Sequence, residues 1–139
     1  AGCAVLAKKN TGITHAPPCT FPDGLKHRLQ SSHVNAVPNC ALHCASVCLV
    51  GGEGLGPTNM AILESTAVAL NVLKGPWVLA GDFNILPDVI ANSGFLGMVA
   101  GVVFQSTLPT CNANVYDYVI VRKSLAHAIV GVQRIEGVG

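Results

Sequence analysis

A short apolar run, Trp77 to Ala80, ends abruptly in Gly81-Asp82-Phe83-Asn84 and limits how this chain can fold. A helix is predicted before it, from an N-cap at Thr58 to about Leu73, and Lys74-Gly75-Pro76 ends that helix. An apolar run with no polar position predicts a buried strand. The rest of the chain must therefore supply neighbouring strands and a covering layer.

Other apolar and β-branched runs predict those neighbours. We expect strands over residues 2–7, 29–35, 41–50, 102–104, 115–121 and 128–135, with a helical or loop segment over 87–101. Strands come first, then a helix that leads into a strand, then more strands. This order favours an α+β or layered α/β domain.

Composition narrows the class of protein. The chain has 139 residues, which is room for one domain. Its net charge of +1 gives no strongly basic surface for nucleic acid, although a local basic groove stays open. The longest apolar run, Phe95 to Phe104, is shorter than the about 18 residues that a membrane span needs. No signal-peptide pattern is present, so we expect an intracellular protein, with the nucleus as one compartment, and no membrane partner. The residues give no indication of oligomeric state.

The cysteines are the next candidates for chemistry. The chain has six of them, without a C-x-x-C pair. Cys40, Cys44 and Cys48 are spaced four apart, so they would share one face of a strand. We expect these three to be reduced, free of metal and packed inside, since buried free cysteine behaves as a small hydrophobe. Disulfides and a metal site are the alternatives.

Asp82 and Asn84 follow the buried strand two residues apart, so their side chains would project together at its carboxyl end. A carboxylate there can orient a water molecule or support a hard cation, and an amide can donate to a phosphate oxygen. From the spacing alone, we favour the simpler interpretation, which is an Asx turn that closes the strand.

Asp117 lies inside the most β-rich run of the chain, Val115 to Val121. Burying an unpaired carboxylate in a strand is unfavourable, so Asp117 must face solvent, a partner or a site. An edge strand that carries one solvated charge explains it as well as a functional site does.

Taken together, these segments resemble the endonuclease/exonuclease/phosphatase family, which has the DNase I-like fold. The segments that carry the resemblance, in chain order, are GCAVLAKKNTGI, SVCLVGGEG, TNMAILESTAVAL, GPWVLAGDFN and PTCNANVYDYVIV. Gly-Glu-Gly before the helix and Pro-Thr-Cys before the later strand are similar to endonuclease domains of non-LTR retroelements (retrotransposons). The resemblance implies a partial DNase I-like layered β-sandwich with flanking helices over residues 1–139, truncated at both ends.

The resemblance also implies a reaction, the hydrolysis of phosphodiester or phosphomonoester bonds, usually with Mg²⁺. In the retroelement branch the reaction is nicking of DNA. By this resemblance Asp82 would orient or deprotonate the attacking water, and Asn84 would bind the scissile phosphate. Asp117 would support the metal or a catalytic histidine, and Asp82 with Asn84 would be weak ligands of Mg²⁺. DNA or another phosphate ester is the implied partner.

Several family positions have no counterpart. The metal-binding glutamate would lie before Ala1, and the closing Ser-Asp-His would lie after Gly139. Cys48 stands where the family has a tyrosine, and His127 follows Asp117 too closely to be the catalytic histidine. We therefore expect little or no activity from this chain alone. Two alternatives are a non-catalytic binding or scaffold module, and a phosphatase or phosphodiesterase completed by flanking residues.

Overall fold

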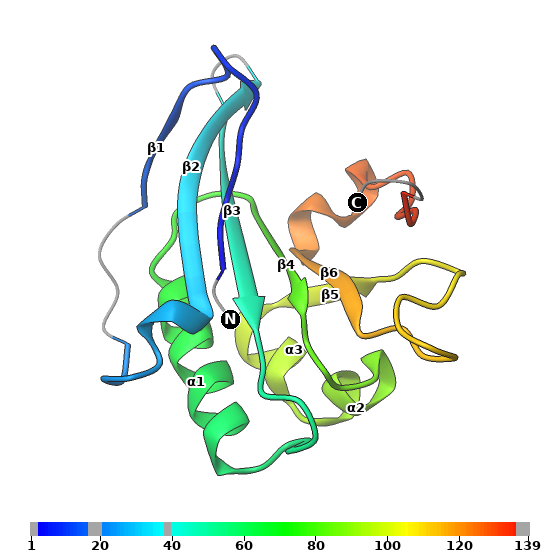
Figure 1. The fold of residues 1–139 in the computed structure, drawn as a ribbon. Coiled ribbons are helices and arrows are strands. Elements are labelled where there is room, and N and C mark those ends of the chain that lie inside the picture. The colour runs from blue at the N-terminus through cyan, green and yellow to red at the C-terminus, as the bar shows by residue number, and fades with distance from the viewer. Residues whose placement is uncertain (1–2, 17–20, 38–39, 136–139) are drawn as a thin grey trace.

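The computed structural model describes residues 3–16, 21–37 and 40–135. The fold is α+β, as predicted, with one six-stranded sheet and three helices on one of its faces (Figure 1). The strands are β1 Ile13–His15, β2 Leu29–Val37, β3 Cys40–Cys48, β4 Trp77–Asp82, β5 Gly101–Phe104 and β6 Asp117–Arg122. The helices are α1 Pro57–Asn71, α2 Pro87–Asn92 and α3 Phe95–Val99, with 3₁₀ turns at Lys26–Arg28 and Lys123–Ala128.

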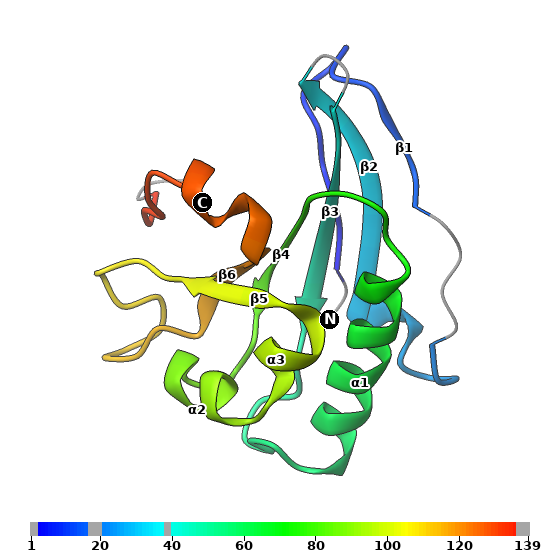
Figure 2. The same cartoon turned by 180° about the vertical axis from the view of Figure 1, so that it is seen from behind.

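The sheet has the order β1-β2-β3-β4-β6-β5, so the apolar strand β4 lies inside it, as its sequence predicts. β3 and β4 are parallel, and the other neighbouring pairs are antiparallel. A parallel pair needs a crossover connection, and α1 supplies it. Seen from behind, α1 and α3 lie across the sheet (Figure 2). This crossover brings the carboxyl ends of β3 and β4 to the same end of the sheet.

The core lies between the helices and one face of the sheet. Alternate strand residues point to this face, and Trp77, Leu79 and Ile120 have 1% or less of their surface exposed. Ile62 and Leu63 of α1 pack against them and are equally buried. Full burial of one such side chain contributes about 1.5–3 kcal/mol, so this layer is the main source of stability.

The opposite face of the sheet is only partly covered. The prediction that the cysteines of β3 are packed inside is therefore wrong for the two whose side chains are described. Cys44 and Cys48 are free thiols on this face and are half-buried rather than packed inside, because β3 turns its odd-numbered residues to the helices. The side chain of Cys40 lies outside the described residues. Burial raises the pKa of the Cys44 thiol.

The expected strands at the two ends of the chain are wrong within the described residues. Residues 3–8 form no strand, and Cys3 instead donates its backbone N–H to the carbonyl of His27. Residues 129–135 follow the second 3₁₀ turn without regular structure. An apolar run becomes a strand only where a neighbouring strand offers hydrogen-bond partners, and neither run has one.

The start of α1 also differs from the prediction. Gly56 is at the N-cap position and Pro57 is the first helical residue, a position that suits proline because its missing N–H is not needed there. The backbone N–H of Thr58 is instead bound by the carboxylate of Glu53, with 2.7 Å between N and Oε1. A carboxylate at this end also interacts favourably with the helix dipole. Within the described residues, no helix combines the length and apolar character that crossing a membrane would require.

Candidate functional site

Two aspartates lie directly opposite each other at one end of the sheet. Asp82 is the last residue of β4 and Asp117 is the first of β6, and they are partners in the antiparallel pairing of these strands. Asp82 is half-buried and Asp117 is exposed. Directly paired residues point to the same face, and like charges in this arrangement destabilise a sheet. A pair of this kind is therefore a place where a cation is favoured.

Asn84 forms the turn that closes β4. Its φ of 51° is in the left-handed region, which asparagine adopts more readily than most residues. Its backbone N–H donates to Oδ1 of Asp82 over 3.1 Å, so the predicted Asx turn is present. The side-chain Nδ2 donates to the carbonyl of Leu49 over 3.1 Å, and Leu49 donates its own N–H to the Asp82 carbonyl over 3.0 Å.

These contacts leave specific atoms available for chemistry. Asp82 uses one carboxylate oxygen in the turn, so Oδ2 stays able to accept from water or to meet a cation. Asn84 uses one of its two side-chain N–H groups, which leaves the other for an anionic oxygen. The residues that form the Asx turn are therefore also residues of the candidate site.

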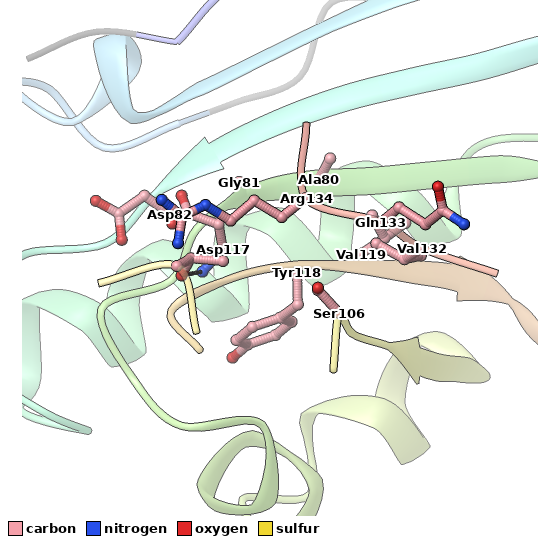
Figure 3. Close-up of a pocket in the computed structure, with 11 residues that line it drawn as sticks. Ala80, Gly81, Asp82, Ser106, Asp117, Tyr118, Val119, Val132, Gln133 and Arg134 are labelled. Atoms are coloured by element: carbon pink, nitrogen blue, oxygen red, sulfur yellow. Dashed lines mark hydrogen bonds between the residues drawn. The ribbon is translucent and has the colours of Figure 1, made fainter. Parts of the chain in front are cut away.

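A cleft of about 440 Å³ contains both aspartates (Figure 3). Its lining comes from β4, β6 and two loops, and includes Ser106, Thr110 and Arg134. The side chain of Arg134 extends toward the aspartates (Figure 3). Its Nη1 donates to the carbonyl of Pro109 over 2.7 Å. Asn84 does not line this cleft. It lies on the side of the glycine-rich loop, where a Cβ built on Gly51 would be 3.4 Å from Oδ1 of Asn84.

The side chain of Thr110 helps to hold the segment before β6. Its Oγ1 accepts the backbone N–H groups of Tyr116 and Asp117, over 2.9 and 3.0 Å. Phe83 donates its N–H to the carbonyl of Tyr116 over 2.9 Å, which joins this segment to the turn after β4. The carboxylate of Asp117 is therefore positioned through its backbone.

Sequence reasoning missed Asn59, which holds the glycine-rich loop. This α1 side chain has no exposed surface. It accepts the N–H of Val50 over 2.7 Å and donates to the carbonyls of Val50 and Gly54 over 3.0 and 2.8 Å. The only sequence signal was an amide in the first turn of a helix that follows a glycine-rich loop, and such amides are common at helix starts.

Sequence reasoning also missed the role of Tyr118. Its ring stacks on that of Phe83 with 4.1 Å between centroids and 7° between planes. Tyr118 is 2% exposed, and its hydroxyl is buried without a hydrogen-bond partner in the described part of the chain. Burial raises the pKa of this phenol well above its ordinary value. The stack fixes the spacing between the Asp82 turn and β6.

The described residues contain no group of three or more His, Cys, Asp or Glu side chains that could hold a metal ion. The cleft offers two carboxylates, Asp82 and Asp117. Mg²⁺ is commonly held by one or two carboxylates together with water and substrate phosphate, so this pair suits a weakly held Mg²⁺. The side chain of Asn84 is directed to Leu49 and the glycine-rich loop. Asp117 is therefore a better second ligand for Mg²⁺ than Asn84.

No family model and no curated protein sequence matches the chain. Solved structures do match. The endonuclease domain of TRAS1, a telomere-specific non-LTR retrotransposon, gives a TM-score of 0.61 at 10% identity, over 86% of this chain and 59% of that chain. The Haemophilus ducreyi cytolethal distending toxin gives a TM-score of 0.50 at 16% identity, over 80% of this chain and 42% of that chain.

These likenesses establish the fold. The chain has a partial DNase I-like fold, since it spans 59% of the retrotransposon domain and 42% of the toxin chain. The single described sheet with its helices corresponds to the α+β architecture expected from the sequence.

Proposed function

We propose that this chain carries part of the site of a metal-dependent phosphodiester hydrolase of the DNA-nicking type, and that it has little activity by itself. The observation that carries the proposal is the pairing of Asp82 with Asp117 across β4 and β6, inside a cleft. The fold adds support, because a solved structure with this fold is an endonuclease domain. DNA is the proposed substrate.

The contacts suggest a role for each side chain. Oδ1 of Asp82 is fixed by the Asn84 N–H, so Oδ2 is held in one direction and can accept a proton from an attacking water. The free N–H of the Asn84 amide would donate to a phosphate oxygen, with the amide plane fixed by Leu49. Asp82 and Asp117 would hold Mg²⁺, which when bound neutralises charge on the phosphate.

The groups available at this site are the reason that we expect low activity. No third carboxylate or imidazole joins the two aspartates among the described residues. A pair of carboxylates binds a hard cation weakly, and the loss of one donor to the transition state typically lowers a rate by about 10²–10³. Residues outside this chain, or a partner, would have to supply the missing groups.

Two measurements on matched variants test the proposal. Asp82→Ala removes the central carboxylate, and Asp88→Ala makes the same change of charge at an exposed position of α2. We expect Mg²⁺ with pyrophosphate to raise the melting temperature of the wild type and of Asp88→Ala, but not of Asp82→Ala. Absence of that shift in the wild type would refute the site. In a supercoiled-plasmid assay with Mg²⁺, nicking by all three proteins should stay near background. Strong nicking by the wild type and Asp88→Ala, but not by Asp82→Ala, would refute the proposal that this chain has little activity by itself.

One observation favours a second candidate, a non-catalytic anion-binding module. Arg134 lines the cleft, and a guanidinium can bind phosphate without a metal. Pyrophosphate stabilisation that persists in EDTA and disappears in Arg134→Ala would favour this module over the hydrolase.

A further inference from the structure

Two histidines contact each other at the opposite end of the sheet from the aspartates. His33 of β2 and His43 of β3 are direct cross-strand partners, and His43 is also paired with Trp77, the first residue of β4. The two imidazole rings have their centroids 3.8 Å apart and their planes at 89°. His43 is 5% exposed, whereas His33 is half-buried.

Each ring has a buried nitrogen without a hydrogen-bond partner in the described part of the chain. These are Nε2 of His33 and Nδ1 of His43. The other nitrogen of His43 lies beside the backbone of Lys74 and Gly75. Buried polar atoms in folded proteins are nearly always paired, so two unpaired nitrogens in one contact need an explanation.

We propose that His33 and His43 form a two-histidine site for a divalent transition-metal cation such as Cu²⁺, Ni²⁺ or Zn²⁺. Imidazole nitrogens are the ligands that these ions favour. Rings this close can each direct one nitrogen at a shared ion after rotation about χ2, a torsion with a broad range. No third His, Cys, Asp or Glu joins them among the described residues, so water completes the coordination shell.

This site does not depend on the proposed hydrolase function. It lies at the other end of β4 from Asp82 and uses none of the residues of the cleft. The ions also differ, because Mg²⁺ prefers oxygen ligands. For one imidazole pair the order of affinity should be Cu²⁺ above Ni²⁺ and Zn²⁺.

Trp77 is a built-in reporter for this site. It is the single tryptophan of the chain, and it is paired with His43 on the neighbouring strand. Cu²⁺ and Ni²⁺ are paramagnetic and quench the fluorescence of a nearby indole. A titration with either ion should therefore give a saturable loss of Trp77 emission.

The experiment compares the wild type with His33→Gln and with His27→Gln, which changes an exposed histidine in the first 3₁₀ turn. We expect His27→Gln to bind Ni²⁺ like the wild type, and His33→Gln to bind at least about tenfold more weakly, because a chelate loses one of its two ligands. If His33→Gln binds Ni²⁺ as tightly as the wild type does, the ion must bind at the thiols or at the exposed histidines, and the proposal is overturned. The absence of saturable quenching in the wild type would also overturn it.

A second measurement needs no variant. Substoichiometric Ni²⁺ should broaden the imidazole NMR signals of His33 and His43 before those of His27 and His127. Broadening of the exposed histidines first would refute the site even if His33→Gln were too unstable to titrate.

Discussion

Replacement of Gly81 by alanine should destabilise this fold strongly, although it adds a single methyl group. Gly81 of β4 lies opposite Val47 of β3 in the parallel pair. A Cβ at position 81 would overlap the carbonyl oxygen of Val47, and it would lie 2.8 Å from its carbonyl carbon and 3.0 Å from its nitrogen. These are backbone atoms, so no change of rotamer can relieve the overlap. β3 and β4 would have to move apart.

The size of the effect follows from this geometry. Overpacking of a well-packed region usually costs about 1–3 kcal/mol, with larger values where the backbone must move. We expect Gly81→Ala to reduce the free energy of unfolding by about 3 kcal/mol or more, which is a large part of the about 5–15 kcal/mol typical of a domain. For a chain of this size, the melting temperature should fall by about 10 °C or more.

Gly97→Ala is the matched control. Gly97 lies in α3, and a Cβ built there meets no atom within 4 Å. Alanine is the better helix former, so this variant should gain up to about 1 kcal/mol. Urea unfolding of the two variants and the wild type gives the comparison. A loss below about 1 kcal/mol in Gly81→Ala would mean that β3 and β4 do not approach as closely as described.

The other stability predictions concern Asn59 and Tyr118. Asn59→Ala leaves the Val50 and Gly54 backbone groups without their partner, so urea unfolding should show a loss of at least about 2 kcal/mol, and a near-neutral result would mean that water replaces the amide. Tyr118→Phe removes a buried hydroxyl that has no partner among the described residues and keeps the stack on Phe83, so stability should be unchanged or rise, and a clear loss would mean that the hydroxyl does have a partner. Because burial raises the pKa of folded Tyr118 above the unfolded value of about 10, wild-type stability should fall as the pH rises above about 10, and Tyr118→Phe should lack this part of the fall.

The central elements could be predicted from the sequence because each is an apolar run between clear breaks. β4 and α1 are the best examples, since Lys74-Gly75-Pro76 separates them. β6 begins at Asp117 rather than at Val115, because the Thr110 hydroxyl binds Tyr116 in the preceding loop. Such a hydrogen bond depends on how the loop folds, and no local sequence pattern predicts it.

Part of the candidate site could be predicted in the same way. The sequence predicts Asp82 at the carboxyl end of its strand, as found, but it places Asp117 inside its strand, whereas Asp117 is the first residue of β6. The pairing of β4 with β6, which sets the two aspartates opposite each other, has no local sequence signal. The roles of Asn59 and Tyr118 depend on which backbone or ring lies beside them, and that is decided by packing. The catalytic roles of Asp82, Asn84 and Asp117 remain predictions.

The hydrogen bonds between Leu49 and the end of β4 have a consequence for how this chain can change during evolution. Asn84 closes the sheet as well as forming the candidate site, so selection for a stable fold alone would keep it whether or not the proposed site is in use. The contact that positions Asp117 uses its backbone N–H, which any residue except proline provides. Without selection for the proposed chemistry, Asp117 should therefore change before Asn84 does. Among related chains, an acidic residue at position 117 would then be the better sign that the proposed site is under selection.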